Sequence, residues 1–359
     1  MAPRNKLLLL QPPFYRLFHE RYALQRYPLS LGYLAAAALG ADWEVRAYNA
    51  DFQPGVPARE SAAWVFGEGH RRYRRAIEEP RGGVWDEVAR AIRDFAPAVV
   101  GITAMTQNWA AGRVVARMVK EIDPAIRVVV GGPHPSMAGA ACFACPDIDF
   151  AVAGEGDATL AELLAALAAE GDPSQVAGLL WRGGGGVLRT PPRPLLDNLD
   201  ALPFPALHAP AVLQDYALYP SHAFMFVAAG RGCPWDCAFC GSREIWGRAA
   251  RLRSPRHIVY EIALLVPRGV MSVRFEDDTF GLDRSHLREL CALIAAEYPR
   301  LTWGCQMRAD LVDEETVRLM RDAGCIDSTP RLMSMQPAST STWGWNRGTT
   351  PCSAACAKG

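Results

Sequence analysis

Three cysteines of the chain are concentrated in one short stretch, RGCPWDCAFCGS. The spacing of Cys233, Cys237 and Cys240 would also place them on one face of a helix, as small buried side chains. Gly232 and Pro234 argue against a helix because both favour turns, and the apolar run before them, AFMFVAAG, has the length of a strand. We therefore expect the three thiols in a loop at the end of a strand.

Three thiols in one loop can bind a metal, form a disulfide with one thiol left over, or occur together by chance. A disulfide framework is typical of small secreted chains, whereas this chain has 359 residues and its other cysteines are scattered. Zinc normally takes a fourth protein ligand from a second cysteine or histidine cluster, and none accompanies this loop. An iron–sulfur cluster accepts three protein thiolates when another ligand occupies the fourth iron. The spacing therefore favours a cluster over zinc or a purely structural loop.

The CxxxCxxC spacing, with Phe239 just before the last cysteine, resembles the signature of the radical SAM enzymes. In that family three thiolates bind a [4Fe-4S] cluster, and the open iron takes the amino and carboxylate groups of S-adenosylmethionine. An electron from the cluster, supplied by a donor such as flavodoxin or ferredoxin, cleaves the sulfonium bond and gives a 5'-deoxyadenosyl radical. The resemblance implies that Cys233, Cys237 and Cys240 are the metal ligands, and that Phe239 lies near the adenine of S-adenosylmethionine.

Acidic residues end the next predicted strand, VMSVRFEDDTF, where Glu276, Asp277 and Asp278 follow one another. Carboxylates at a strand's carboxyl end can receive the ammonium group of S-adenosylmethionine, and the resemblance favours this role over a solvated loop or a helix cap. Because side chains alternate along a strand, Glu276 and Asp278 should share one face and Asp277 the other. Arg308, after the third strand, is a candidate for the ligand's carboxylate, with an exposed arginine as the alternative.

The second half of the chain alternates strands with helices, which predicts a parallel sheet, open or closed into a barrel. Ser254, Asp283 and Asp313 are each placed to begin a helix, and active sites of such sheets lie at the carboxyl ends of the strands. The resemblance implies a radical SAM partial barrel, of which residues 221–326 supply only the first part. Residues 327–359 have neither helical nor strand period, so we expect an irregular or disordered tail and a truncated or frameshifted gene product.

The first 170 residues predict a doubly wound, Rossmann-like α/β domain of about five strands. Apolar strand-length runs alternate with helical patterns, and Asp157 is placed to cap the last of these helices. A ligand of such a domain lies across the carboxyl ends of the strands. The predicted strands are 6–10, 43–50, 98–104, 126–132 and 149–157.

Three loops lie at the carboxyl ends of the last three of these strands: TAMTQN (103–108), GGPHPS (131–136) and GEGD (154–157). Glycines at such positions let a flat ligand or a phosphate approach the backbone, although no GxGxxG or Walker motif is present. Together the loops resemble those of the cobalamin-binding domain that precedes many radical SAM cores. The resemblance implies that cobalamin is a further cofactor. Its predicted contacts are Thr103, Met105, Gly131, Gly132, His134, Gly154 and Glu155.

One departure from other cobalamin proteins concerns the cobalt ligand. The Asp-x-His-x-x-Gly motif is absent, and QPPFYRLFH follows the first strand in its place. We therefore expect cobalamin to bind without its own base and without a protein histidine on cobalt. His134 is interpreted as a loop or tail contact or as a structural histidine. Cys142 and Cys145 form a lone CxxC for which we expect no metal.

Residues 171–220 are expected to form a glycine-turn hairpin and a proline-broken linker between the two domains. The formal net charge of zero gives no sign of nucleic-acid binding, and no apolar run reaches the roughly 18 residues of a membrane span. Exposed cluster thiols fit a reduced, cytoplasmic compartment.

Three functional classes follow. The first is a cobalamin-dependent radical SAM enzyme, a methyltransferase or a ring-forming catalyst acting on a small molecule or natural product. The second is an RNA methylthiotransferase-like enzyme, which the neutral charge disfavours. The third is a non-catalytic fragment that binds cobalamin or a cluster without turnover.

Overall fold

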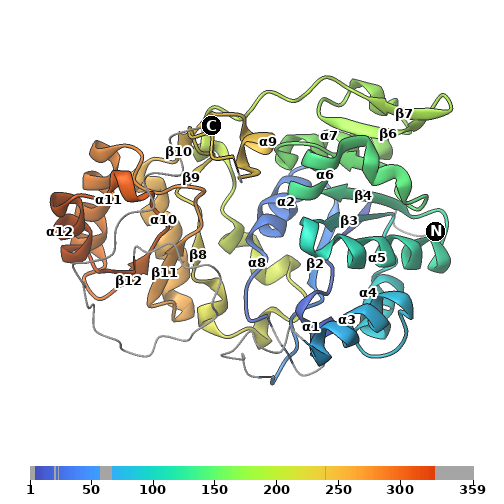
Figure 1. Ribbon diagram of the computed structural model, residues 1–359, viewed down its shortest axis with the longest axis horizontal. Helices are drawn as coiled ribbons and strands as arrows, with labels where there is room; N and C mark the ends of the chain where they lie inside the picture. Colours follow the sequence, from blue (N-terminus) through green and yellow to red (C-terminus); the bar gives the residue numbers. More distant parts are fainter. Residues whose placement is uncertain (1–4, 20–21, 23, 57–66, 239, 328–359) are drawn as a thin grey trace.

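The chain forms two α/β parts that lie side by side, each built on a sheet of its own (Figure 1). This arrangement is seen in a computed structural model that describes residues 5–19, 22, 24–56, 67–238 and 240–327. The residues of the predicted tail beyond Asp327 lie outside this range. Among the helices of the described ranges, none is long and apolar enough to cross a membrane.

The first part contains the predicted doubly wound sheet, with strand order β2-β1-β3-β4-β5-β6-β7. The first five strands are parallel, and the chain reverses its direction of travel across the sheet between β1 and β3. Ligands of doubly wound sheets bind at the carboxyl ends next to such a reversal. The parallel strands are β1 (Lys6–Gln11), β2 (Glu44–Asn49), β3 (Val99–Thr103), β4 (Arg127–Gly131) and β5 (Phe150–Val152).

Helices cover both faces of this sheet because successive strand residues point to opposite sides. Leu7 and Leu9 belong to the buried cluster that includes α2 and α7, whereas Leu8 and Leu10 belong to the cluster that includes α4 and α5. The helices of this part are α1 (Tyr15–Phe18), α2 (Leu29–Leu39), α3 (Glu68–Glu78), α4 (Val84–Phe95), α5 (Trp109–Ile122), α6 (Pro133–Ala138) and α7 (Gly156–Ala168).

Several details differ from the sequence-based expectation. Strand β5 (Phe150–Val152) is shorter than the predicted strand 149–157, and residues 156–157 belong to α7 instead. Helix α7 begins at Gly156 with Glu155 at its cap position, so the prediction that Asp157 caps it is wrong, and Asp157 lies in the first turn instead. The glycine-turn hairpin is present as β6 (Leu179–Gly183) and β7 (Gly186–Arg189), and it extends the first sheet through antiparallel pairing of β6 with β5. The chain continues through the short helix α8 (Pro205–Val212) into the second part.

The second part has a parallel sheet of order β13-β12-β11-β8. Its helices begin where the sequence predicts, because the side chains of Ser254, Asp283 and Asp313 each accept a backbone N–H bond of the first turn. A short antiparallel pair, β9 with β10, leads into and out of the cysteine loop. The elements are β8 (Phe226–Val227), β9 (Gly230–Arg231), α9 (Ser242–Trp246), β10 (Arg251–Leu252), α10 (Pro255–Leu265), β11 (Ser272–Phe275), α11 (Arg284–Glu297), β12 (Thr302–Gly304), α12 (Glu314–Asp322) and β13 (Cys325–Asp327).

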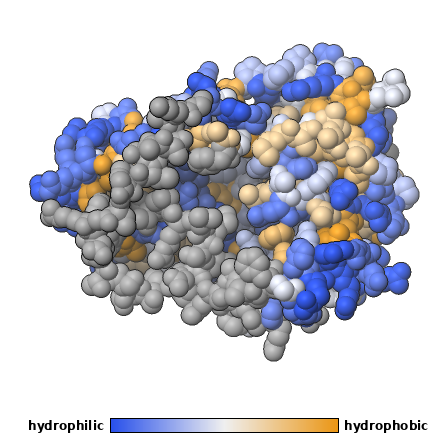
Figure 2. Space-filling view, in the orientation of Figure 1, coloured by the Kyte–Doolittle hydropathy of each residue, from blue (hydrophilic) through white to orange (hydrophobic). Residues whose placement is uncertain are grey.

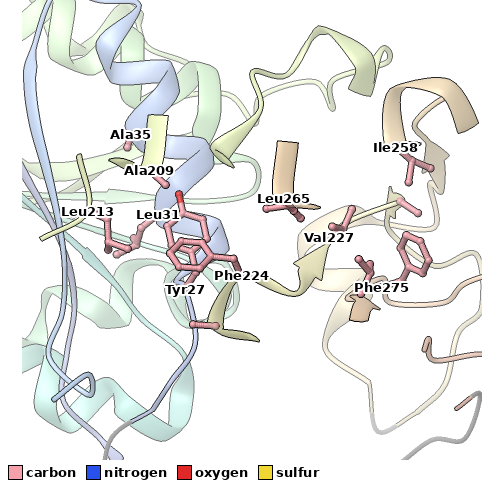
Figure 3. Packing of buried hydrophobic residues seen from close by; sticks show 14 of the residues in the cluster. Tyr27, Leu31, Ala35, Ala209, Leu213, Phe224, Val227, Ile258, Leu265 and Phe275 are labelled. Carbon is pink, nitrogen blue, oxygen red and sulfur yellow. The ribbon is translucent and has the colours of Figure 1, made fainter. Parts of the chain in front are cut away.

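One buried apolar cluster runs without interruption from the first part into the second. Tyr27 stacks on Phe224 with ring centroids 5.2 Å apart, and both contact the layer that contains α2 and α8. Figure 3 shows this layer facing Leu265, Val227 and the other labelled side chains of the second part. A shared core fixes how the two sheets sit, and so where their loops meet.

Candidate functional site

The cysteine loop runs from β9 to α9 and carries Cys233, Cys237 and Cys240. The first two residues are half-buried and the third is exposed, and none of the three is in a disulfide. The backbone N–H of Cys240 donates to the carbonyl of Cys237 at 2.9 Å, which makes the predicted turn. Phe239 lies outside the described residues. The donor set, three free thiols on one loop, fits the predicted iron–sulfur cluster.

The three thiols are not assembled around a common point. Within the described ranges, no group of three or more His, Cys, Asp or Glu side chains is arranged to hold a metal ion. The base of the loop is tightly fixed nevertheless, because Gly232 has φ +91° and a Cβ there would lie 2.0 Å from the carbonyl oxygen of Ala249. The base of the cysteine loop is therefore fixed by close backbone packing.

The acidic run after β11 supports the base of the cysteine loop. Asp277 is buried, and its carboxylate accepts from the backbone N–H groups of Ala229, at 3.3 Å, and of Gly230. Burial outweighs these hydrogen bonds and raises the pKa of Asp277 to about 7. Asp278 accepts from the N–H of Gly232 at 3.1 Å.

Glu276 pairs with Arg26 of the first part at 2.8 Å. Both side chains are half-buried, and the guanidinium of Arg26 also lies 3.9 Å from the ring centre of Phe226. The acidic run therefore braces the site, while its predicted role toward the S-adenosylmethionine ammonium stays a prediction.

Arg308 reaches the cysteine loop from the end of β12. One of its nitrogens lies 3.3 Å from the sulfur of Cys237, and its guanidinium lies 4.5 Å from the ring centre of Trp235. Asp310 pairs with it at 2.9 Å. The sequence predicted this arginine for the carboxylate of S-adenosylmethionine, and the structure places it at the loop where that ligand is expected.

The glycine loops lie at the carboxyl ends of β3, β4 and β5. Gly132 has φ +105°, and a Cβ there would come within 3.0 Å of the carbonyl oxygen of Ala104. The N–H of His134 donates to this same oxygen at 2.9 Å, so the loop after β4 is closed against the loop after β3. The predicted contacts Thr103, Met105, Gly131, Gly132 and His134 are thereby brought to one edge of the sheet.

Ser136 joins the third glycine loop to the second. Its hydroxyl donates to the carbonyl of Gly132 at 2.9 Å and accepts from the N–H of Gly154 at 3.0 Å. The sequence analysis missed this residue, although a serine directly after a glycine-proline loop is a known signal for such local bonds. Met105 and Met137 are 43% and 46% exposed beside these loops, and they offer apolar surface to a flat ligand. Figure 2 shows weakly hydrophobic residues around α6 and α7 on the same face.

His134 is held within its own loop region. Its Nδ1 lies 3.2 Å from the hydroxyl of Thr106, and its ring centre lies 4.5 Å from that of Trp109. Partial burial, and secondarily the charge of Arg113, lower the pKa of His134 below its usual value. The side chain is therefore neutral near pH 7 and bonded to its own domain, which fits the interpretation as a loop contact.

The loop after β1 is closed by a buried acid that the sequence analysis did not single out. Asp51, just after β2, accepts from the N–H groups of Phe14 at 2.9 Å and Arg16 at 3.1 Å. Burial raises the pKa of Asp51 to about 6 in spite of these bonds.

The glycine loops and the cysteine loop meet at the boundary between the two parts. Glu155, predicted as a cobalamin contact, is buried, and its carboxylate pairs with Arg231 at 3.0 Å and with Arg251 at 2.9 Å. Burial alone would raise the pKa of Glu155, but hydrogen bonds from Arg251, the N–H of Leu196 and Arg231 hold it below its usual value. Neither arginine was expected from the sequence, because contacts between residues this far apart leave no periodic signal.

Comparison with protein families assigns both parts of the chain. Residues 20–164 match the family model described as B12 binding domain, and residues 227–332 match the Radical SAM superfamily. These matches cover the glycine loops and the cysteine loop respectively. The chain therefore combines a B12-binding domain with a radical SAM domain.

Several proteins resemble the chain in sequence. An uncharacterised methyltransferase of Pyrococcus horikoshii is 32% identical over 243 residues, which is 67% of this chain and 52% of the relative. Cytidylyl-2-hydroxyethylphosphonate methyltransferase of Streptomyces wedmorensis is 26% identical over 90% of this chain and 64% of the relative. Anaerobic magnesium-protoporphyrin IX monomethyl ester cyclase of Synechocystis is 33% identical over 50% of this chain and 36% of the relative. The chain thus spans between about a third and two thirds of the length of these relatives.

The fold is also that of a solved radical S-adenosylmethionine methyltransferase, TsrM from Kitasatospora setae. Its structure with tryptophan and an S-adenosylmethionine analogue matches with a TM-score of 0.67 and 19% identity, over 91% of this chain and 59% of TsrM. TsrM has also been solved with cobalamin and a [4Fe-4S] cluster. The predicted family, fold class and cofactor set are confirmed at the level of the family, whereas the individual site residues and the domain boundaries stay predictions.

Proposed function

We propose that this protein is a cobalamin-dependent radical SAM methyltransferase that acts on a small molecule. One observation carries the proposal: the glycine loops of the B12-binding part and the cysteine loop of the radical SAM part converge at one boundary, joined by Glu155 and Arg231. Two cofactor sites can act on one substrate only when they share a space. The methyltransferases among the relatives support the choice of methyl transfer over ring formation.

In this proposal Cys233, Cys237 and Cys240 hold the [4Fe-4S] cluster, and the glycine loops hold cobalamin. When bound, the cluster and S-adenosylmethionine supply a radical that takes hydrogen from an unactivated carbon, and cobalamin carries the methyl group. A low-potential protein such as flavodoxin or ferredoxin would supply the electron, and the exposed position of Cys240 supports a reduced, cytoplasmic setting.

The chain's own residues orient and shield these groups. Gly132 lets the loop after β4 pack closely on the loop after β3, and Met105 and Met137 would supply apolar contact area to a corrin ring. Arg308 is placed beside the cysteine loop to receive a carboxylate, and the acidic run fixes the loop from below.

Anaerobic turnover tests the proposal. The purified chain is reconstituted with iron and sulfide, loaded with hydroxocobalamin, and given S-adenosylmethionine with a chemical reductant. Formation of 5'-deoxyadenosine, absent when Cys233, Cys237 and Cys240 are replaced by alanine, is the expected result. Cobalamin uptake without 5'-deoxyadenosine would instead support a protein that binds cofactors without turnover, and absence of both would overturn the proposal.

A further inference from the structure

The boundary between the two parts contains a small cluster of opposite charges, which we call the boundary clamp: Glu155, Asp157, Arg231 and Arg251. Arg231 donates to Glu155 at 3.0 Å and to Asp157 at 2.8 Å. Arg251 donates to both carboxylate oxygens of Glu155, at 2.9 and 3.1 Å, and to the carbonyl of Leu196 at 2.7 Å. The side chains of all four are between 5% and 16% exposed, so these ion pairs are shielded from water.

The clamp connects two functional loops directly. Glu155 belongs to the glycine loop after β5, and Asp157 to the first turn of the helix that follows this loop. Arg231 lies two residues before Cys233, and Arg251 pairs with it across the β9–β10 ladder. A displacement of the glycine loop therefore moves the charges that hold both strands flanking the cysteine loop.

The clamp is also incomplete. In the described part of the chain, Nε and one terminal nitrogen of Arg251 are buried and have no hydrogen-bond partner. Buried guanidinium N–H groups are costly to leave unpaired, so this arginine can donate a hydrogen bond to a further acceptor atom at the boundary. The hydroxyl of Ser242, at the start of α9, is likewise buried without a partner. The unpaired donors lie on the cysteine-loop side of the boundary, where a rearrangement on ligand binding would reach them.

We propose that Arg231 and Arg251 are positioning residues that couple cobalamin binding at the glycine loops to the ordering of the cysteine loop. The inference rests on the proposed function, because it takes the glycine loops as the cobalamin site. Coupling is reciprocal, so an ordered cysteine loop also tightens cobalamin binding by the same factor. A buried, multiply hydrogen-bonded ion cluster suits this task because removal of one partner leaves the others uncompensated.

Hydrogen exchange of the purified full-length chain, with and without hydroxocobalamin, tests the coupling. In the wild-type chain we expect protection of the glycine loops and, through the clamp, an increase of about five- to tenfold in protection of residues 229–246. R231Q should keep protection of the glycine loops and lose it at residues 229–246. R231K should recover part of it, since lysine retains the charge but not the forked contact.

Arg193→Gln is the matched control. Arg193 pairs with Glu162 of α7, the helix that also carries Asp157 of the boundary clamp. It also donates a hydrogen bond to Thr159 of the same helix, so neither contact reaches the radical SAM part. In this variant, hydroxocobalamin should protect both the glycine loops and residues 229–246 from exchange, as in the wild-type chain. If R231Q does not fold, R251Q provides the same comparison from the other arm of the clamp.

Two results would overturn the inference: protection of the glycine loops in the wild-type chain with no change at residues 229–246, or the same spread of protection in R231Q and R251Q as in the wild type. The first leaves the proposed function standing, because cobalamin still binds where expected. No hydroxocobalamin binding by the wild-type chain would overturn the proposed function, and the coupling with it.

Discussion

The glycine loops after β3 and β4 are held to each other by neutral groups, whereas the glycine loop after β5 and the cysteine loop are held largely by carboxylates and ion pairs. Backbone N–H groups, carbonyls and the hydroxyl of Ser136 close the three glycine loops against one another. The base of the cysteine loop depends on Asp277 and Asp278, and on the ion pairs of Arg231. The two sites thus differ in what holds them: close backbone contacts at the glycine loops after β3 and β4, and carboxylates and arginines at the base of the cysteine loop.

This difference has a physical consequence. Neutral hydrogen bonds keep their strength across ordinary pH, but carboxylates lose their acceptor charge when they are protonated. We therefore expect the cysteine loop to respond to pH and to its metal, and the glycine loops to respond mainly to changes of shape.

Replacement of Cys233, Cys237 and Cys240 by alanine should have the largest effect and separate the two sites completely. Iron and sulfide incorporation, followed by visible absorbance and electron paramagnetic resonance, should fall to background, because no other thiol lies on this loop. Hydroxocobalamin binding should persist. Cys142→Ala is the control, since Cys142 is a buried thiol of the first part, and retained cluster signal in the triple variant would contradict the ligand assignment.

Asp277→Asn tests whether the base of the cysteine loop depends on charge. The pKa of Asp277 is raised from 3.8 to about 7 on folding, so the stability due to its protonated form is present below about pH 4 and is lost as the pH rises toward 7. Relative to wild type, the asparagine variant should gain up to about 4 kcal/mol in free energy of unfolding between pH 4 and pH 8. Urea unfolding of the apoprotein at several pH values measures this.

Asp283→Asn is the control, because folding lowers the pKa of Asp283 whereas it raises the pKa of Asp277. Hydrogen bonds at the start of α11, first from Ser285, lower the pKa of Asp283, so its contribution is present above the unfolded value and lost only at lower pH. The difference between this variant and wild type should stay flat above pH 5. A flat difference for Asp277→Asn as well would show that this carboxyl is ionised without penalty.

Gly132→Ala tests whether the glycine loops depend on the close approach of their backbones. An alanine must adopt φ +105° and place its Cβ 3.0 Å from the carbonyl oxygen of Ala104, so the loop must shift. We expect hydroxocobalamin affinity to fall by about tenfold or more, with cluster incorporation unchanged. Gly139→Ala, with φ +53° and nothing within 4 Å of its Cβ, controls for backbone strain, and equal losses in both variants would refute the role given to close approach.

His134→Gln should have the smallest effect. The imidazole is bonded to Thr106 and packed on Trp109, so its loss should change hydroxocobalamin affinity by no more than about threefold. Electron paramagnetic resonance of the reduced cobalamin complex should show no change in axial nitrogen coupling. A loss of such coupling in the variant would make His134 a cobalt ligand. It would overturn the expectation that no protein histidine binds the cobalt.

The local elements of the fold could be predicted because their signals are local. Apolar runs of strand length and the capping residues Ser254 and Asp283 gave correct predictions of most strand positions and of these helix starts, although β5 ends at Val152 and not at residue 157. The prediction failed at Asp157, where an acidic residue near a helix start was taken for the cap although it serves an ion pair with Arg231. A capping residue and a first-turn acid look alike in sequence, and only the partner distinguishes them.

The sequence by itself determined the chemical groups of the protein: three thiols on a turn, glycines after parallel strands, and acids at a strand end, each read from neighbours along the chain. The tertiary structure alone decided which of these groups face one another. Asp277 became a buried brace because β11 pairs with β8, which places it beside Ala229 and Gly230. Glu155 became a link to Arg231 because the two sheets share one apolar core, which brings together residues that lie far apart in the chain. Side-chain burial and pairing across such distances depend on packing, which no local pattern encodes.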